Sequence, residues 1–149
     1  AVSGTDAFPV WKWTREVPEA VPPSKGRFSD SGYDLTLISH IKTKNNVYYY
    51  DTGLKVIPPI GYYFDLVGRS SISKSGWMLA NNVGIIDCSY RGTIIVALVR
   101  IAGDTDTPEI KLPCRLVQLI PRRLVLMNNI EIEEVGVTER NIGNFGSTN

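Results

Sequence analysis

The sequence predicts an all-β fold. Its apolar residues come in short runs, and glycine or proline interrupts them roughly every ten residues, a rhythm typical of strands joined by turns. No segment keeps a helical hydrophobic period for more than about two turns. At 149 residues the chain is long enough for one domain with a sizeable core. We therefore expect a single β domain over residues 1–149.

Short segments rich in β-branched and aromatic residues predict the individual strands. They are residues 33–38, 47–51, 54–57, 62–67, 77–79, 83–86, 93–101, 109–112, 116–121 and 130–135. Turns are expected at residues 52–53, 58–61 and 102–104. Pro58 and Pro59 cannot donate a backbone N–H to a ladder, so a strand must end before them.

Residues 93–99 form a nearly continuous run of apolar β-forming residues. Such a run predicts a strand that is buried on both faces. Either a core shared with other subunits or the interior of a closed barrel explains this burial.

The two ends of the chain differ in composition from the predicted β core at residues 28–139. Residues 1–27 carry several prolines with Trp11 and Trp13, which predicts an extended arm with aromatic anchors. Residues 140–149 are rich in Gly, Asn, Ser and Thr around one Phe, which predicts a flexible tail.

Charge and composition exclude several classes of protein. Sixteen basic and fifteen acidic residues give a net charge of +1 without a basic stripe, so direct binding to nucleic acid is not expected. No apolar run is long enough to span a membrane, and the first residues lack the pattern of a secretory signal. Cys88 and Cys114 are expected to be free thiols in a reducing intracellular compartment, the cytoplasm or nucleus, and a viral or cellular origin stays open. His40 is the only histidine and is expected in a solvated loop, which argues against a Ser/His/Asp triad.

Residues 81–92 are the most informative segment. Gly84 and Gly92 permit a tight hairpin, and Asp87 and Tyr90 would project from its flanks. A carboxylate and an aromatic ring three residues apart suit a small nucleotide pocket. An ordinary β-turn with a solvated Asp explains the same residues equally well.

Four further segments carry polar groups suited to chemistry. Asp34 stands at the start of a predicted strand, where Asp is disfavoured. Residues 68–71 place Arg69 and two serines after a strand, either as a phosphate cradle or as a polar turn at a helix start. Gln118 lies among apolar residues and needs a hydrogen-bond partner if it is buried. Residues 143–148 set Phe145 among small donors that can fold over a ligand.

Taken in order, these segments resemble the five motifs of the trimeric deoxyuridine triphosphatases, or dUTPases. Residues 31–35 resemble the first motif, 68–71 the second, 81–92 the third, 115–118 the fourth and 140–149 the fifth, and the similarity covers about residues 28–149. The resemblance implies a jelly-roll-like subunit, a distorted β-barrel, that assembles as a homotrimer. It further implies three active sites, each built from motifs of all three chains and each hydrolysing dUTP to dUMP and pyrophosphate.

The resemblance also implies roles for individual residues. Asp87 would orient and deprotonate the attacking water, and Asp34 would sit behind that water or hold a water of the metal shell. The resemblance implies Mg²⁺ as cofactor, held by substrate phosphates and waters without a direct protein ligand. The residues expected to bind substrate are Asn81 with backbone groups of Gly84 and Ile86 at uracil, Tyr90 at the sugar, Arg69, Ser70, Ser71 and Gln118 at the phosphates, and Phe145 stacked on the base under a lid closed by Arg140, Gly146, Ser147 and Thr148.

The match has departures and leaves alternatives. Asn141 and Asn144 stand where the family usually has glycine, so closure of the lid is expected to be slower or less complete. A deoxycytidine triphosphate deaminase would need a Glu on the strand after the hairpin, but residues 93–97 carry no carboxylate. A non-catalytic interaction module of the same fold would usually have lost the carboxylates Asp34 and Asp87. An active enzyme that also binds a protein partner through its aromatic arm stays open.

Overall fold

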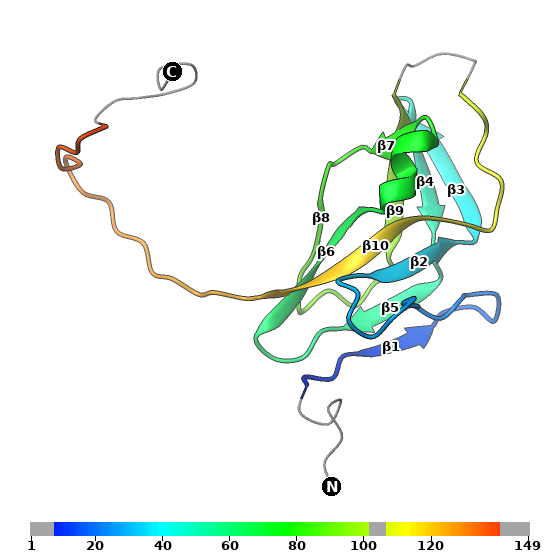
Figure 1. The fold of residues 1–149 in the computed structure, drawn as a ribbon, viewed down its shortest axis with the longest axis horizontal. Coiled ribbons are helices and arrows are strands. Elements are labelled where there is room, and N and C mark those ends of the chain that lie inside the picture. The colour runs from blue at the N-terminus through cyan, green and yellow to red at the C-terminus, as the bar shows by residue number, and fades with distance from the viewer. Residues whose placement is uncertain (1–7, 102–106, 141–149) are drawn as a thin grey trace, which may run out of the picture.

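The computed structural model describes residues 8–101 and 107–140, and the regular secondary structure in these ranges is almost all β-strand. Two four-stranded antiparallel sheets enclose a core as a jelly-roll-like distorted barrel, and a two-stranded sheet lies beside them (Figure 1). The strands are β1 (Lys12–Arg15), β2 (Tyr33–Leu37), β3 (Ser39–Lys44), β4 (Val47–Asp51), β5 (Leu54–Ile57), β6 (Tyr62–Gly68), β7 (Trp77–Leu79), β8 (Gly84–Ile86), β9 (Ile95–Arg100) and β10 (Cys114–Arg123). A 3₁₀ helix, η2 (Ser70–Lys74), follows β6. The all-β prediction is confirmed.

The strand order decides which distant segments meet. The first sheet has the order β2-β10-β6-β8, the second has the order β3-β4-β9-β7, and β1 pairs with β5. Strand β10 therefore inserts between β2 and β6, which come much earlier in the chain. Gln118 on β10 is opposite Asp34 of β2 on one side and Val67 of β6 on the other.

The core lies between the two large sheets and follows the period of two that a half-buried strand requires. The large apolar side chains that are less than 2 % exposed come from both sheets, from β5 and from the residue before β9: Leu35, Leu37, Leu54, Val56, Phe64, Ile94, Val96, Leu98, Val117 and Leu119. Trp77 closes one end of this core, and its indole N–H donates to the carbonyl oxygen of Pro108 at 2.9 Å.

Most predicted strands are present with bounds shifted by a few residues, but two are wrong. Residues 109–112 form no strand, because Pro108 and Pro113 bracket them and remove ladder donors at both ends. Residues 130–135 form no strand either, because no part of the described chain lies beside them to complete a ladder.

Two strands, β1 and β3, were not predicted because their sequences are mostly polar and lack an apolar alternation. Every residue of both strands is exposed, so their pairing with β5 and β4 decides their conformation. Asn45 and Asn46, with φ of 52° and 65°, supply the left-handed turn that joins β3 to β4. The prediction of a loop around His40 is therefore wrong, because His40 is an exposed residue of β3.

Strand β9 differs from the predicted burial on both faces. Val96 and Leu98 point into the core and are fully buried, whereas Ile95 on the opposite face is 36 % exposed. Met78 on the neighbouring strand β7 is 44 % exposed. One chain thus buries one face of β9 fully and leaves the other face, which carries Ile95, Ala97 and Val99, only partly covered.

The chain after β10 leaves the body of the molecule as a long extended segment (Figure 1). Leu124 begins it with a backbone N–H donated to the carbonyl oxygen of Gly61 at 2.8 Å. We call residues 124–140 the C-terminal arm, to distinguish them from the N-terminal arm predicted at residues 1–27. At the other end of the chain, the region predicted to be an extended arm contains β1, whose neighbour Trp11 packs edge-on against Tyr33 and Phe64. None of the described helices is long and apolar enough to cross a membrane.

Candidate active site

Side chains from three of the predicted motifs meet on the outer face of the first sheet. Asp34 comes from β2, Arg69 follows the end of β6, and Gln118 comes from β10. Strand β10 separates the other two strands, and Arg69 reaches across it so that its Nε lies 3.0 Å from Oδ1 of Asp34. This arrangement places a carboxylate, a guanidinium and an amide in one cluster.

Arg69 is held at several points. Its Nη1 donates to the carbonyl oxygen of Arg115 at 2.9 Å, and its backbone N–H donates to the carbonyl oxygen of Leu116 at 2.8 Å. Both acceptors lie beside a bulge between Cys114 and Val117, where β10 shifts register against β2. A guanidinium has five N–H donors in a rigid fork. The donors on Nε and Nη1 fix the position of the side chain through Asp34 and Arg115. The guanidinium is therefore pre-oriented as a donor for phosphate oxygens.

Gln118 has the partner that its half-buried position requires. Its Nε2 donates to the carbonyl oxygen of Gly68 at 3.2 Å, which confirms that the amide needed a partner. Its Oε1 lies over Gly32, where an added Cβ would come within 2.1 Å. Gly32 of the first motif is therefore the residue that makes room for the amide of the fourth motif.

A cavity of about 290 Å³ opens among these three motifs. Its lining residues are Gly26, Asp30, Ser31, Gly32, Asp34, Arg69, Ser70, Gln118 and Ile120. Ser70 and Ser71 are exposed at the start of η2, so residues 68–71 are both a turn and a helix start. The polar lining suits a polar group better than an apolar one.

Residues 81–92 do not form the two-stranded hairpin that the glycines predict. Their one strand, β8, pairs only with β6, and residues 87–92 turn away without a ladder partner. The backbone N–H of Tyr90 donates to the carbonyl oxygen of Asp87 at 3.1 Å, so the segment does contain the expected turn. Both of these side chains are exposed. The amide of Asn81 lies near Gly84, where an added Cβ would meet its Nδ2 at 3.4 Å.

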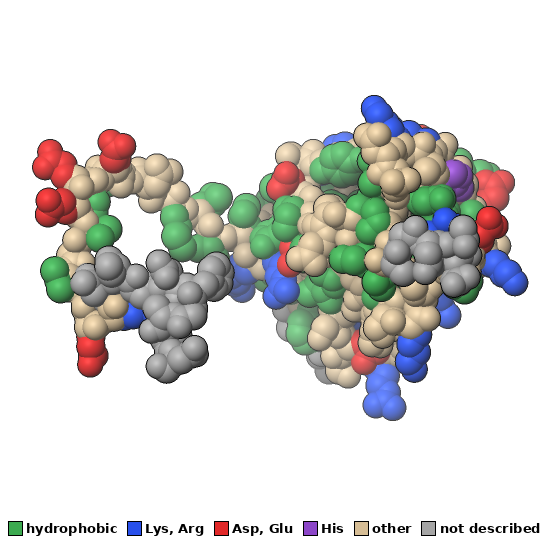
Figure 2. Space-filling model, turned by 90° about the horizontal axis from the view of Figure 1, so that it is seen from above, with side chains coloured by type: hydrophobic (Ala, Val, Ile, Leu, Met, Phe, Trp, Pro, Cys, Tyr) green, Lys and Arg blue, Asp and Glu red, His purple; other side chains and the backbone are tan. Residues whose placement is uncertain are grey.

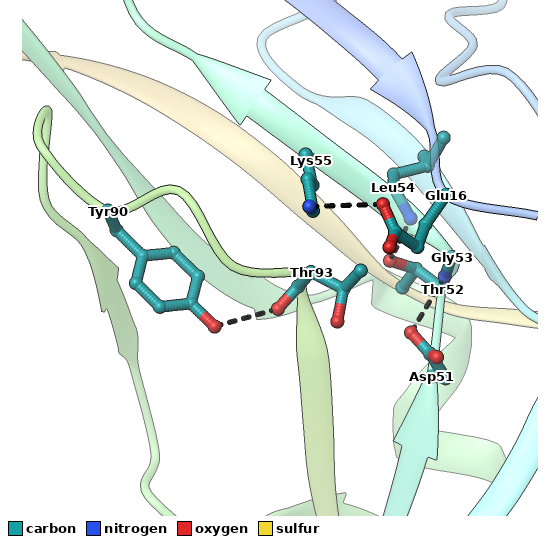
Figure 3. A network of polar contacts seen from close by, with 8 residues as sticks. All are labelled: Glu16, Asp51, Thr52, Gly53, Leu54, Lys55, Tyr90 and Thr93. Atoms are coloured by element: carbon teal, nitrogen blue, oxygen red, sulfur yellow. Dashed lines mark hydrogen bonds and ion pairs between the residues drawn. The ribbon is translucent and has the colours of Figure 1, made fainter.

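The Tyr90 side chain is held over the end of residues 81–92 by its own contacts with Gly92 and Thr93. Its hydroxyl donates to the carbonyl oxygen of Thr93 at 2.9 Å (Figure 3). The ring packs over Gly92, where a Cβ would come within 2.3 Å of the Tyr90 hydroxyl oxygen. Gly92 is thus required for close approach of the ring rather than for an unusual φ.

Thr52 anchors the same loop and was not predicted as a site residue. It is fully buried, and its hydroxyl donates to the carbonyl oxygen of Ile94 at 2.8 Å. The N–H of Ile94 in turn donates to the carbonyl oxygen of Leu54 at 2.8 Å. The sequence offered one signal, the Asp51-Thr52-Gly53 turn, and a turn alone does not indicate a buried hydroxyl.

Within a single chain, Asp87 lies far from the cluster around Arg69. In the β6–β8 ladder, Ile86 is opposite Phe64, so Asp87 lies beyond Phe64, at the far end of β6 from Arg69. Five residues separate Phe64 from Arg69, which is roughly 16 Å of strand at about 3.3 Å per residue. Either the two groups serve different sites, or a second chain supplies one of them.

The remaining predicted residues lie at the end of the C-terminal arm or beyond it. Arg140 is exposed at the end of the described chain, and Phe145, Gly146, Ser147 and Thr148 lie outside the described residues. Among the described residues no group of three or more His, Cys, Asp and Glu side chains could hold a metal ion.

Cys88, beside Asp87, is an exposed free thiol, whereas Cys114 is half-buried and burial raises the pKa of its thiol. Burial likewise raises the pKa of the Tyr50 hydroxyl.

Comparison with known proteins agrees with the family that the sequence resembles. The family model for dUTPase matches residues 19–149. A probable deoxyuridine 5'-triphosphate nucleotidohydrolase of Schizosaccharomyces pombe is 34% identical over 131 residues, which are 87% of this chain and 91% of that protein.

Solved structures show the same fold. The dUTPase of Staphylococcus bacteriophage 80alpha with dUPNHPP superposes with a TM-score of 0.78 at 21% identity, covering 94% of this chain and 98% of the other. A variant dUTPase from phage phi11 of S. aureus, described with a structural Mg(II) ion, has a TM-score of 0.68 at 18% identity and covers 84% and 97% of the two chains. By the family model and the sequence identity together, the chain belongs to the dUTPase family.

Proposed function

We infer that this chain hydrolyses dUTP to dUMP and pyrophosphate. The observation that carries this inference is the polar cavity in which Asp34, Arg69 and Gln118 meet, although they come from three motifs far apart in the sequence. A guanidinium fork, a helix-start serine and an amide are suitable donors for a triphosphate. The relatives in the family act on the same nucleotide by name.

We propose that Arg69 binds the phosphates, and its fixed geometry supports this role. Its position is set by Asp34 and by the carbonyl oxygen of Arg115, so little side-chain entropy is lost when it bonds phosphate oxygens. Ser70 and Gln118 line the same cavity and supply further donors. We propose that Ser71 adds a hydroxyl from the next position of η2.

Asp87 is proposed as the general base. Its carboxylate is exposed in the turn after β8, where a water can reach it. That water would lose a proton to the Asp87 carboxylate as its oxygen bonds the α-phosphorus. The bond between the α-phosphorus and the oxygen bridging to the β-phosphate breaks, and its electron pair leaves with pyrophosphate. Positioning of the water contributes much of the rate.

Selection of the nucleotide is assigned to the loop around Asp87. The Asn81 amide and the backbone groups of Gly84 and Ile86 would bond the uracil edge in a pattern that cytosine cannot match. Tyr90, held by its bond to the carbonyl oxygen of Thr93, would pack under the sugar and leave no room for a 2′-hydroxyl.

The donor set fits Mg²⁺ held mainly by the substrate. Mg²⁺ keeps several waters and prefers phosphate oxygens, and one Asp34 oxygen is already bonded by Arg69, so that carboxylate suits an outer contact through a water. When bound, the ion would neutralise phosphate charge during the reaction. We propose no direct protein ligand for it.

We propose that the active enzyme is a homotrimer whose sites combine residues of different chains. Support comes from the distance between Asp87 and Arg69 within one chain and from the apolar outer face of β9, where Ile95 is 36 % exposed. We propose that the tail of a third chain closes over the bound nucleotide. The tail residues that would contact it are Arg140, Phe145, Gly146, Ser147 and Thr148. Because dUTP is an intracellular nucleotide and both cysteines are free thiols, we place the activity in a reducing compartment.

A four-nucleotide comparison tests the proposal. Purified chain with Mg²⁺ is incubated with dUTP, dTTP, dCTP and UTP, and pyrophosphate and deaminated product are both measured. We expect pyrophosphate from dUTP at a rate far above that from the other three. Deamination of dCTP would instead indicate the related deaminase, and no turnover of any nucleotide would indicate a non-catalytic module.

A further inference from the structure

A hollow separate from the Arg69 cluster lies at one end of the core. Val96, Leu98 and Arg100 follow one another on the inner face of β9, because alternate residues of a strand share a face. Val96 and Leu98 are fully buried, whereas Arg100 is only partly buried, so the packed core ends beside it. A cavity of about 280 Å³ opens there, and we call it the Arg100 hollow. Four residues with aromatic rings line it together with one basic and one acidic residue: His40, Tyr48, Tyr50, Trp77, Arg100 and Glu109.

The strand register brings these rings together. Residues that lie opposite each other in a ladder point to the same face of the sheet. Tyr50 is opposite His40, and Trp77 is opposite Arg100. The ring centroids of His40 and Tyr50 are 5.2 Å apart, and those of Tyr48 and Trp77 are 5.0 Å apart in an edge-to-face contact. The aromatic walls of the hollow therefore hold one another in place.

The segment that follows residue 107 forms another wall. The Trp77 indole N–H donates to the carbonyl oxygen of Pro108 at 2.9 Å and fixes this segment beside the hollow. Ile110 and Leu112 add aliphatic side chains to the lining, and Glu109 is exposed at its rim. The mouths of β-barrels are preferred sites for small ligands, which bind among apolar walls and a few polar groups.

Arg100 enters the hollow without a polar partner. Its guanidinium carbon lies 5.2 Å from the ring centroid of Tyr48 and 5.0 Å from that of Trp77, so its contacts are with aromatic rings. Its Nε is buried and has no hydrogen-bond partner, and no ion pair among the described residues includes Arg100. A partly buried charge is costly unless it is paired. Because Nε is covered, a partner that enters the hollow would bond the Nη groups at the tip of the side chain.

The groups around Arg100 select the chemistry of a ligand. A carboxylate matches the fork of a guanidinium through two parallel hydrogen bonds. Burial raises the pKa of the Tyr50 hydroxyl, so at neutral pH this hydroxyl keeps its proton and can donate as well. The rings and the side chains of Ile110 and Leu112 suit a flat apolar body. The Glu109 carboxylate at the rim repels a second negative charge, which disfavours phosphate.

We propose that the Arg100 hollow binds a small organic monocarboxylate with a flat apolar body, its carboxylate on the Nη groups of Arg100 and its body against the aromatic walls. This site is independent of the proposed dUTP site. It opens from the inner face of the second sheet, whereas Asp34, Arg69 and Gln118 lie on the outer face of the first. Figure 2 shows the C-terminal arm standing clear of the body, and no residue of that arm lines the hollow.

His40 provides a direct test because it is the only histidine of the chain. Its imidazole proton signals are followed by NMR at constant pH while benzoate is added to the full chain. We expect the signals to shift and to saturate with a dissociation constant of about 1 mM or below, whereas unmoved signals at about 10 mM benzoate would overturn the proposal. Benzamide has the same shape without the charge, so it should bind about tenfold more weakly. Equal binding of benzamide would show that Arg100 does not select a carboxylate.

Variants of the two charged lining residues test the same contact. Arg100→Gln should weaken benzoate binding by about tenfold or more, and Arg27→Gln, at an exposed arginine outside the hollow, is the matched control. Glu109→Gln changes only an exposed rim residue and should tighten benzoate binding about twofold, which keeps the test decisive if the Arg100 variant does not fold. Equal affinities of the Arg100 and Arg27 variants, or weaker binding by the Glu109 variant, would contradict the proposed site.

Inorganic phosphate and dUTP turnover separate this site from the Arg69 cluster. Phosphate should leave the His40 signals in place, and saturating benzoate should leave kcat and KM for dUTP unchanged. Signals of His40 that move equally with phosphate would indicate unspecific attraction of anions and would overturn the carboxylate site. Competitive inhibition by benzoate without a shift of His40 would place benzoate at the Arg69 cluster and would overturn it as well.

Discussion

Asp34 and Arg69 form an ion pair across a strand that lies between them: Nε of Arg69 is 3.0 Å from Oδ1 of Asp34, and β10 separates β2 from β6. On its way across β10 the guanidinium also donates to the carbonyl oxygen of Arg115. Only a fork-shaped cation can satisfy both acceptors and still face the cavity. The pair therefore orients Arg69 more than it stabilises the fold.

Arg69→Lys should separate the orientation of the side chain at position 69 from the stability of the fold. Lysine keeps the charge but cannot bond Asp34 and the carbonyl oxygen of Arg115 with a fixed fork. Because the pair is partly exposed, the free energy of unfolding should change by less than about 1 kcal/mol. The KM for dUTP should rise by about tenfold or more, as a lost charged hydrogen bond to phosphate predicts. Steady-state kinetics and denaturant titration measure both, and Arg27→Lys serves as control; an unchanged KM would remove Arg69 from the phosphate site.

Asp87→Asn should remove the base without removing the shape of the loop. We expect kcat to fall by about 10²–10⁴-fold, the range for loss of general base catalysis, while the dissociation constant for a non-hydrolysable analogue stays within about threefold. Glu109→Gln, an exposed carboxylate outside the motifs, is the matched control. Normal turnover in the Asp87 variant would assign the base to another residue.

Gly32→Ala should act through Gln118. The added Cβ would lie within 2.1 Å of Oε1 of Gln118 and 2.8 Å of Cδ1 of Ile120, so the amide must leave its bond to Gly68. These atoms are the ends of flexible side chains that can move aside, so the change should cost little stability, but the displaced amide should raise the KM for dUTP. Thermal unfolding and kinetics are compared with Gly136→Ala, whose Cβ would meet nothing within 4 Å. A variant as stable and active as the control would show that the amide moves freely.

Gly92→Ala should relax the selection of the sugar. Its Cβ would come within 2.3 Å of the Tyr90 hydroxyl oxygen and would push the ring away from its place. We expect the ratio of kcat/KM for dUTP over UTP to fall by about tenfold or more. Tyr90→Phe keeps the ring and loses only the bond to Thr93, so it should retain most of the discrimination. Loss of discrimination in the Phe variant alone would indicate that the hydroxyl, and not the ring, tests the sugar.

The two cysteines should react at different rates. Burial raises the pKa of the Cys114 thiol, so at pH 8 it holds less of the reactive thiolate, and its half-buried side chain also restricts access. Cys88 is exposed beside Asp87 and should be alkylated first, and bound nucleotide should protect it. Peptide mass spectrometry after brief iodoacetamide treatment measures both sites, with Cys88→Ser as control. Raising the pH above 9 should increase the Cys114 rate; faster labelling of Cys114 at pH 8 would contradict the buried position.

The sequence predicted the central strands well because their residues agree locally with their environment. Apolar alternation in β5 and in the middle of β10 reports burial directly, and the family resemblance singled out Asp34, Arg69 and Gln118. The sequence did not predict β1 and β3, because all of their residues are exposed and their strand conformation depends on distant partners. It failed again at residues 130–135, where strand propensity is present but no partner strand exists in the described chain.

What the sequence by itself determined is the all-β class and the identity of the polar groups, since both follow from residue types and their order. Only the tertiary structure decided that Gly32 makes room for Gln118, that Thr52 anchors the Asp87 loop, and that Asp87 lies far from Arg69 in one chain. The physical reason is that these relations depend on long-range strand order. Inserting β10 between β2 and β6 sets distances that no local pattern contains.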